Sequence, residues 1–255
     1  MTAPLLFLVV PCYNESKRIN FEYFDKIANI AGVRLFFVDD GSRDNTLEML
    51  EKYSSKGKAQ HLALEKNKGK ARAIRSGIQH LHNLDSEAEW VGFIDADQAF
   101  DLRTIGEMIA LLPEMEINGI EAIYSSRVKL LGRSITRKYS RHYFSRVIST
   151  FFGFAWTTIP YDTQSGFKLY KNSREFRLAV STLEFKTRWF FDIETHLELC
   201  KSYGRNLNGW EHPVHSWRDI QGSRITKFEK LRISYEILIV LGKIWSSRRM
   251  LSKIQ

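Results

Sequence analysis

The chain has 255 residues, which fits one large α/β domain and is long enough to bury a core without disulfides or metals. Hydrophobic residues make up 44% and charged residues 26%, values that exclude a disordered, collagen-like or coiled-coil protein. The excess of 38 basic over 29 acidic side chains gives a net charge of +9, which favours an anionic partner such as nucleic acid, a membrane surface or a phosphorylated small molecule.

The N-terminal residues and the cysteines give no sign of export. The apolar start of the chain lacks a basic segment and a cleavage site, so we interpret it as a strand and not as a signal peptide. Cys12 and Cys200 cannot form a disulfide framework or a metal-ligand spacing, which indicates a reducing compartment. The longest uncharged stretch, 147–161, is shorter than the ~20 apolar residues of a spanning helix, so we expect no membrane span.

In the first half of the chain, short apolar runs alternate with amphipathic segments, the pattern of β-α-β units around a mostly parallel sheet. The expected strands are 5–10, 35–38, 60–64, 91–94 and 122–125. The expected helices are 23–30, 44–53 and 70–80, with Ser42 and Asp44 as caps of the second. We therefore predict a single Rossmann-like α/β domain with a mostly parallel central sheet.

After Ser126 the composition becomes basic and aromatic. The cations up to residue 146 are Arg127, Lys129, Arg133, Arg137, Lys138, Arg141 and Arg146, with no acid among them and with tyrosines and phenylalanines between them. Further on, a strand is expected at 167–170, a helix at 189–200, a strand at 214–217 and a helix from 228 to the C-terminus. This pattern predicts basic amphipathic helices in the second half, which can lie on an anionic membrane without spanning it.

Polar clusters follow the first two expected strands. Pro11, Tyr13 and Glu15 come after the first, and Asp39 and Asp40 after the second. Ligands of open α/β sheets bind outside the carboxyl ends of the strands, where Tyr13 can stack on a base and a carboxylate can accept from a uracil N–H or a ribose hydroxyl. The alternative, that Asp39 and Asp40 only cap a turn into the next helix, stays open.

Two further carboxylates, Asp95 and Asp97, follow the expected strand at 91–94. Mg²⁺ or Mn²⁺ takes oxygen ligands and shares its coordination shell with phosphates. An Asp-x-Asp pair is common in surface loops, but its position at the end of a buried strand strengthens the case for a metal site.

A basic stretch, NKGKAR (67–72), begins the expected helix at 70–80. Cations and a glycine at a helix N-terminus suit a phosphate. For Lys68 and Lys70 we favour an ordinary solvated helix start, and for Arg72 a phosphate contact stays open.

Seven motifs carry a family resemblance. In the first half they are VVPCYNE (9–15), VDDGS (38–42), NKGKA (67–71) and DAD (95–97). In the second half they are DTQSGFKLY (162–170), RWFFDIE (188–194) and WRDIQGSR (217–224). In this order they resemble the family 2 glycosyltransferases with a GT-A fold, and are similar to dolichyl-phosphate β-glucosyltransferases and less closely to dolichyl-phosphate mannose synthases.

The resemblance implies a metal-dependent, inverting transfer of glucose from UDP-glucose to a polyprenyl or dolichyl monophosphate at the cytosolic face of a membrane. By position, it implies nucleoside contacts from Pro11, Tyr13, Glu15 and Asp40, and a Mg²⁺ or Mn²⁺ site at Asp95 and Asp97. It also implies acceptor-phosphate contacts from Arg127 and Arg137, and a diphosphate contact from Arg224. Residues 1–126 would then bind the nucleotide sugar and residues 127–255 the acceptor, with interfacial helices or a membrane-anchored partner subunit giving access to the lipid.

Two departures from the family pattern affect these expectations. Mannose synthases can place a glutamine two positions after the second metal aspartate, whereas this chain has Gln98 directly after Asp97 and then Ala99, so the third metal ligand is open. Many relatives also carry membrane-spanning segments, which are not expected here.

Other roles remain open for several second-half residues. Arg137 and Arg141 could form a solvated basic face instead of an acceptor clamp. Asp162, Asp192 and Glu194 could organise arginines, bind sugar hydroxyls or supply a base, and Glu194 could equally join Glu198 and Lys201 in a surface ion-pair ladder.

Alternative functions are a saccharide or other hydroxyl acceptor, GDP-mannose as donor, or a nucleic-acid-binding module. The last would explain the basic charge, but no nucleic-acid motif is visible, and the paired acids would repel phosphate without a cation. We therefore expect no nucleic-acid partner.

Overall fold

The computed structural model describes residues 5–84, 87–136, 152–153, 156, 158–218 and 227–252, and omits the side chains of 84 and 227–231. The strands are β1 (Leu6–Cys12), β2 (Val33–Asp39), β3 (Gln60–Ala63), β4 (Trp90–Ile94), β5 (Ala122–Ser126), β6 (Ser134–Thr136), β7 (Phe167–Lys171), β8 (Gly209–Pro213) and β9 (Ser216–Arg218). The helices are α1 (Phe21–Ala28), α2 (Thr46–Ser54), α3 (Lys70–Leu84), α4 (Leu102–Ala110), α5 (Leu112–Ile117), α7 (Arg174–Thr182), α8 (Phe191–Tyr203) and α9 (Lys227–Leu251).

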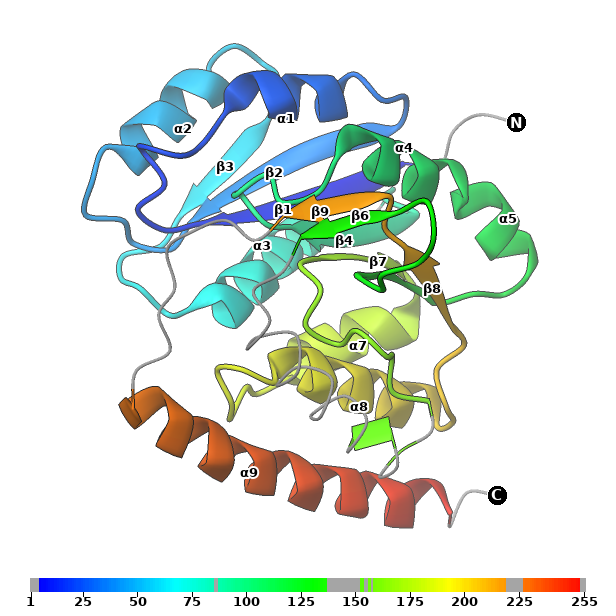
Figure 1. Cartoon of the computed structure of the whole chain (residues 1–255). Coiled ribbons are helices and arrows are strands. Elements are labelled where there is room, and N and C mark those ends of the chain that lie inside the picture. The colour runs from blue at the N-terminus through cyan, green and yellow to red at the C-terminus, as the bar shows by residue number, and fades with distance from the viewer. Residues whose placement is uncertain are drawn as a thin grey trace.

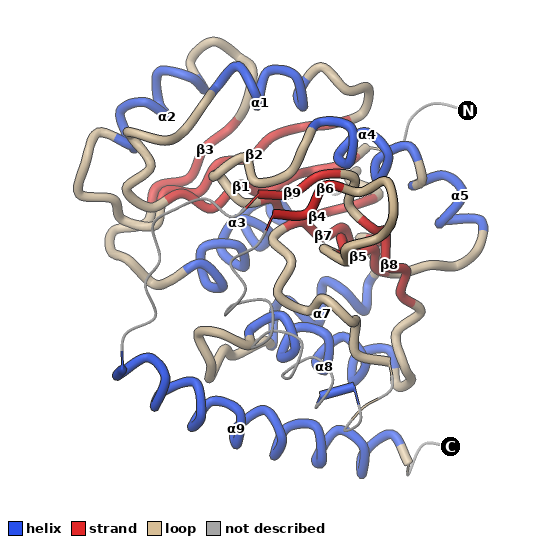
Figure 2. Tube along the Cα trace, in the orientation of Figure 1, coloured by secondary structure: helices blue, strands red, loops and turns tan. Residues whose placement is uncertain are grey.

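A seven-stranded sheet with the order β3-β2-β1-β4-β7-β5-β8 forms the centre of the molecule (Figures 1 and 2). Its neighbouring strands pair in parallel except around β7, which is antiparallel to both β4 and β5. A small second sheet pairs β6 with β9. Because β7 is reversed, the residues before it lie at the edge where β4 and β5 end, and Ile94 pairs with Phe167 at that edge.

Helices cover both faces of the sheet. Helices α1, α2, α4 and α5 pack on one face, and α3, α7 and α8 on the other; α9 runs outside α8 as an additional layer (Figure 1). Strand β1 shows why two covered faces are needed, since Leu6, Leu8 and Val10 enter one core while Phe7 and Val9 enter the other. A strand buried on both faces has a continuous apolar sequence, as expected for parallel strands.

The fold class expected from the sequence, a single α/β domain with a mostly parallel sheet, is confirmed. The first-half strands and helices are confirmed to within a few residues. The strand expected at 214–217 is confirmed in part, since β9 begins at Ser216. Buried Val214 lies between β8 and β9, where the chain leaves one sheet for the other, and donates its N–H to the Ser126 carbonyl (3.0 Å). The expected helix at 189–200 begins later, at Phe191.

Three helices, α4, α5 and α7, were not expected. Two of them begin at side-chain caps, since Asp101 accepts from the Thr104 N–H (2.6 Å) and Ser173 from the Phe176 N–H (3.0 Å). The basic segment of the second half lies largely outside the described residues, beginning at Arg137. In the described part of the chain, no helix combines the length and apolar character needed to cross a bilayer.

Candidate functional site

Buried acids and an exposed aromatic ring lie together at the carboxyl ends of β1 and β2. Tyr13 is 39% exposed, whereas Glu15 and Asp39 are buried. One oxygen of each acid, Glu15 Oε2 and Asp39 Oδ1, is buried with no hydrogen-bond partner among the described residues. Buried polar atoms are normally paired, so these two oxygens favour a ligand that donates hydrogen bonds. Pro11 lies in β1 beside them.

Asp40, directly after β2, binds the backbone of the loop that precedes α3. Its two oxygens accept the N–H groups of Lys68 and Gly69, both at 2.8 Å. Gly41 allows this approach because it has a φ of +65° and because a Cβ there would lie 2.6 Å from the Lys66 backbone carbon. Asp39 Oδ2 likewise accepts the Ser42 N–H (3.0 Å). Both acids therefore stabilise the loop that follows them, as the turn-capping alternative predicts.

Asp95 and Asp97 lie at the end of β4 at the same edge. Burial and the charge of Asp95 raise the pKa of the Asp97 carboxyl, which shows that the two carboxylates repel each other. Lys70 is exposed at the start of α3, as expected for a solvated helix start, and its Nζ also forms an ion pair with Asp95 Oδ1 (2.5 Å). Desolvation alone would lower the pKa of the Lys70 ammonium, but the charges of Asp95 and Asp192 raise it.

This pair of carboxylates suits a divalent cation, because hard oxygen ligands that repel each other are stabilised by a positive charge between them. No cluster of three His, Cys, Asp or Glu side chains suited to a metal occurs in the described ranges. Gln98, the residue left in question by the sequence, donates its side-chain amide to the Arg18 carbonyl (2.9 Å), and Ala99 has no ligand atom. A cation held here would take its remaining ligands from a phosphate or water.

The loop at 162–166 reaches this edge because β7 is reversed. Gly166 packs so closely against Asp95 that a Cβ would lie 2.1 Å from Asp95 Oδ2, and its carbonyl accepts the Asp95 N–H (3.0 Å). Asp162 binds Arg127 through the guanidinium Nε and Nη2 (both 2.7 Å) and the backbone N–H (2.8 Å). The loop therefore connects Asp95 to a partly buried arginine.

Arg127 lies in an anionic environment. Burial alone would lower the pKa of its guanidinium, but Asp162 and, further away, Asp95 and Asp192 raise it. Its guanidinium carbon also lies 5.0 Å from the ring centroid of Trp217. These contacts fix a permanently charged group beside the site, as a clamp for an anion requires.

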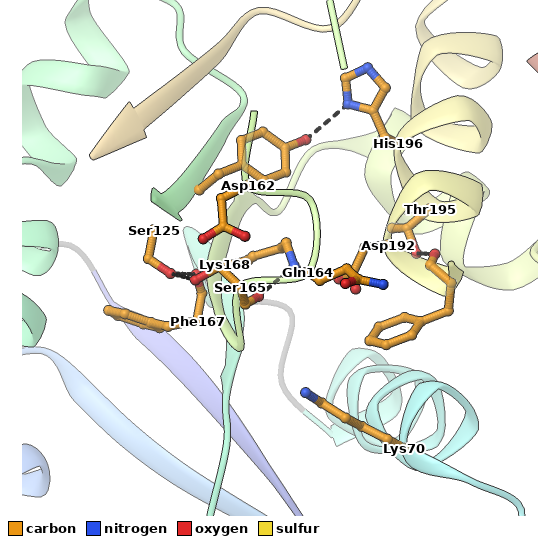
Figure 3. A network of polar contacts seen from close by, with 12 residues as sticks. Lys70, Ser125, Asp162, Gln164, Ser165, Phe167, Lys168, Asp192, Thr195 and His196 are labelled. Atoms are coloured by element: carbon orange, nitrogen blue, oxygen red, sulfur yellow. Dashed lines mark hydrogen bonds and ion pairs between the residues drawn. The ribbon is translucent and has the colours of Figure 1, made fainter. Parts of the chain in front are cut away.

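A buried ion pair between Lys168 and Asp192 lies under the loop (Figure 3). Both side chains are buried, and Lys168 also donates to the Ser165 carbonyl (2.6 Å). Burial lowers the pKa of the Lys168 ammonium, although Asp192 opposes this effect. Ser165 is held from a second side by Ser125, whose hydroxyl lies 2.5 Å from that of Ser165 and donates to the Phe167 carbonyl (2.7 Å).

The loop is also connected to α9. Gln164 Nε2 donates to the Trp189 carbonyl (3.1 Å), and the Trp189 N–H donates to Glu236 Oε2 (2.8 Å). Glu236 is 2% exposed and pairs through its other oxygen with Arg232 (2.9 Å). The backbone of one residue, Trp189, therefore links the site loop to α9.

The surface ladder expected for Glu194, Glu198 and Lys201 is only partly correct. Glu198 and Lys201 form an ion pair (3.1 Å), but Glu194 is buried and accepts from the Thr187 N–H (3.0 Å) and hydroxyl (2.8 Å). Glu194 also pairs with Lys243 of α9, which anchors this helix to α8.

The remaining expected residues are less central or lie outside the described residues. Arg72 is exposed and, among the described residues, donates hydrogen bonds to the carbonyls of Lys68 (3.5 Å) and Phe185 (3.4 Å). Arg137 and Arg224 lie outside the described residues. Cys12 is buried, and burial raises the pKa of its thiol well above the usual value, in line with a small apolar role.

Sequence reasoning missed the roles of Lys70 and Lys168. Lys70 is the first residue of a helix at the carboxyl edge of the sheet, which is a signal that could have identified it. Lys168 falls on the same strand as Phe167 and Leu169, both fully buried, and a lysine within a buried strand requires an anionic partner.

A family model described as "Glycosyl transferase family 2" matches residues 7–174 of the chain. The dolichyl-phosphate β-glucosyltransferase of Dictyostelium discoideum is 26% identical over 265 residues, covering 94% of this chain and 77% of that protein. The dolichyl-phosphate β-glucosyltransferase of Homo sapiens is 29% identical over 241 residues, covering 88% of this chain and 70% of that protein.

Among solved structures, the chain resembles glucosyl-3-phosphoglycerate synthase from Mycobacterium tuberculosis in complex with Mn²⁺, UDP and phosphoglyceric acid. The TM-score is 0.66 at 16% sequence identity, and the match covers 94% of this chain and 78% of the other. At this identity the likeness shows a shared fold.

Proposed function

Because the chain belongs to glycosyl transferase family 2 and is a nucleotide-sugar-dependent glycosyltransferase, we propose that it transfers a hexose to a polyprenyl or dolichyl monophosphate. The first-choice donor is UDP-glucose, and the anomeric centre is inverted. Two relatives that span most of the chain support this acceptor class, since both are named dolichyl-phosphate β-glucosyltransferases. Residues 1–126 then bind the donor and residues 127–255 the acceptor.

On the donor side, the nucleoside lies against the ends of β1 and β2. Tyr13 stacks on the base, and the unpaired oxygens of Glu15 and Asp39 accept from the base N–H or the ribose hydroxyls. Asp40 acts mainly through the loop it holds, which begins α3 and carries Lys70.

Asp95 and Asp97 would hold Mg²⁺ or Mn²⁺ beside the diphosphate. A bound divalent cation supplies positive charge where the leaving group gains negative charge. The chain contributes a cation of its own there, because the Lys70 ammonium already lies at Asp95, and a positive charge beside a departing diphosphate stabilises the negative charge that develops on it.

The observation that carries the choice of acceptor is the contact between Asp162 and Arg127. Asp162 accepts three N–H groups of Arg127, and Asp192 pairs with Lys168, so neither acid is placed as a base for a hydroxyl acceptor. A phosphate monoester needs no base because its second pKa is about 6 and it is largely dianionic at neutral pH. Arg127 then binds and orients the phosphate.

The proposal also places the protein at the cytosolic face of a membrane, because the acceptor is a lipid. Contact with the bilayer is peripheral, or is provided by a membrane-anchored partner subunit.

Donor and acceptor are tested together. With Mn²⁺ present, UDP at about 100 times its Kd should raise the Tm by roughly 5–10 °C, and GDP should not, because ligand binding to the native state stabilises it by about 2.7 kcal/mol. Polyprenyl phosphate should accept glucose from UDP-glucose, while free polyprenol and saccharides should not. Transfer to a saccharide or polyprenol would establish the hydroxyl-acceptor alternative, and stabilisation by GDP alone would overturn the choice of donor.

Gly166→Ala tests the packing of the loop against Asp95. A Cβ would lie 2.1 Å from Asp95 Oδ2, so the carboxylate must move, and we expect a roughly 10²-fold loss of transfer activity, as for other displacements of about 1 Å in a site. The matched control is Gly106→Ala in α4, where nothing lies within 4 Å of the new Cβ, and full activity is expected. Equal activity of both variants would contradict the proposed role of the loop.

A further inference from the structure

Helix α9 has apolar residues on two opposite faces. The inner face packs on the protein through Ile233, Val240 and Ile244, which are buried. It is fixed in rotation by two buried acids, Glu236, which binds the Trp189 N–H (2.8 Å), and Glu194 of α8, which pairs with Lys243. The direction of the opposite face is therefore set by the fold.

The outward face carries a regular stripe. Tyr235, Leu238 and Trp245 are 65%, 67% and 61% exposed. Together with Gly242 and Arg249 they are spaced three and four residues apart, so they lie in one row along the helix. In Figure 1, α9 is the outermost layer beyond α8, so no other described element covers this row. Three large exposed apolar side chains in a row indicate a binding surface.

The charges around the row have one sign. Arg232, Arg248 and Arg249 are exposed, and the guanidinium of Arg249 lies 4.4 Å from the ring centroid of Trp245. The one acid between residues 232 and 252 is Glu236, which is 2% exposed and faces inward. The described outward face of α9 thus presents aromatic and aliphatic groups among cations, with no carboxylate.

We propose that this face of α9 lies on an anionic lipid surface, with Tyr235, Leu238 and Trp245 at the level of the headgroups and the positive charge at its C-terminal end, Arg248 and Arg249, at the lipid phosphates. Tyrosine and tryptophan favour this depth, and arginine can bury its stem while its charge stays with the phosphates. A second copy of the chain fits less well, because the exposed charges beside the row are positive and would face the same charges of the other copy. The choice of a lipid partner rests on the proposed lipid-linked acceptor.

Binding of α9 to the lipid surface would also affect the loop at 162–166, because the two are connected by hydrogen bonds. The inner face of α9 holds Trp189 through Glu236, and Trp189 holds Gln164 of the loop at 162–166. The membrane surface and the acceptor-binding loop are therefore connected through one helix and one peptide.

Flotation with vesicles tests the proposal. The full chain should bind vesicles of phosphatidylcholine mixed with phosphatidylserine and bind much less to phosphatidylcholine alone. Leu238→Ser with Trp245→Ser, and separately Arg248→Gln with Arg249→Gln, should each lower the partition coefficient by roughly tenfold or more, because buried apolar area and paired lipid charge both contribute.

Matched controls are Ile117→Ser, which removes an apolar side chain 75% exposed on α5, and Lys52→Gln with Lys56→Gln, which removes exposed charges on and after α2. These variants should bind vesicles as the parent does, and all variants should keep the Tm and the stabilisation by UDP. Unchanged binding of the α9 variants, or no binding by the parent, would overturn the proposal.

Sedimentation tests the remaining alternative, that this face of α9 is an interface between two copies of the chain. If the parent is a dimer and the α9 variants are monomers, the face is an interface between copies and the lipid assignment is wrong. Vesicle binding that depends on α9, combined with no transfer to polyprenyl phosphate, would refute the proposed acceptor while this inference stands.

Discussion

Asp97→Asn should reduce transfer by roughly 10³-fold while raising the Tm. The loss follows because one carboxylate of the proposed metal pair disappears, and removing a single stabilising group at a developing charge has effects of this size. The Tm should rise because burial and Asp95 raise the pKa of the Asp97 carboxyl, so its negative charge is less favourable in the folded state than in the unfolded state. Asparagine keeps the oxygen that accepts the Ala99 N–H (3.1 Å).

The matched control is Asp25→Asn, for which the change in stability has the opposite sign and transfer is unchanged. Asp25 pairs with Lys58 (2.8 Å) and accepts from the Tyr53 hydroxyl (2.7 Å), and these two contacts lower the pKa of its carboxyl. This variant should lose some stability and keep full activity. Calorimetry measures the stability, transfer assays measure the activity, and Mn²⁺-dependent UDP binding measures occupancy of the donor site. Full transfer by the Asp97→Asn enzyme, or a lower Tm, would refute the assignment.

Lys168→Met should destabilise the protein by about 3–5 kcal/mol, because Asp192 is left as a buried charge without its partner. Lys168 is 1% exposed, so water cannot replace the lost ammonium. For a chain of this size the expected decrease in Tm is roughly 6–20 °C. Lys171→Met on the same strand is the control, since Lys171 pairs with Glu116 at a partly exposed position and should contribute less than about 1 kcal/mol.

The double variant Lys168→Met with Asp192→Leu separates stability from positioning. Replacing both charges by apolar groups should restore most of the free energy of unfolding. Transfer should stay low, because the Ser165 carbonyl has lost the ammonium that holds it at 2.6 Å. A double variant that is both stable and fully active would show that the pair has no part in positioning the loop at 162–166.

Most strands of the first half could be predicted because strands buried on both faces leave an unbroken apolar sequence. Strand β4 illustrates this, since all five of its residues are buried. Strand β3, at the sheet edge, is an exception, since Gln60 and Ala63 are exposed. Helices α4 and α7 are short, and their caps, Asp101 and Ser173, are residue types found throughout loops. Their presence depends on packing against the sheet, which sequence periodicity does not specify.

The site could be predicted where its residues follow parallel strands in chain order, as Asp39 and Asp95 do. Contacts that depend on the reversal of β7 could not be predicted, because the strand's direction decides which end reaches the site. The pairing of Lys168 with Asp192 spans 24 residues and joins β7 to α8, and no local pattern records it. The pairing of Lys70 with Asp95 likewise requires a helix and a strand to meet in three dimensions.

The contact between Arg127 and Asp162 also encloses the segment 128–161 between two fixed points. Both ends of this segment are tied by the same three hydrogen bonds, of 2.7, 2.7 and 2.8 Å, at the edge of the sheet. The free energy of closing a loop grows only with the logarithm of its length, so the length of the chain between these ends has a small effect on folding. Replacements are costly where the segment joins the fold, at β6, which pairs with β9, and at the buried side chains of Phe152, Trp156 and Ile159. The contact between Arg127 and Asp162 therefore holds the two ends of this segment together at the sheet edge, beside the loop at 162–166.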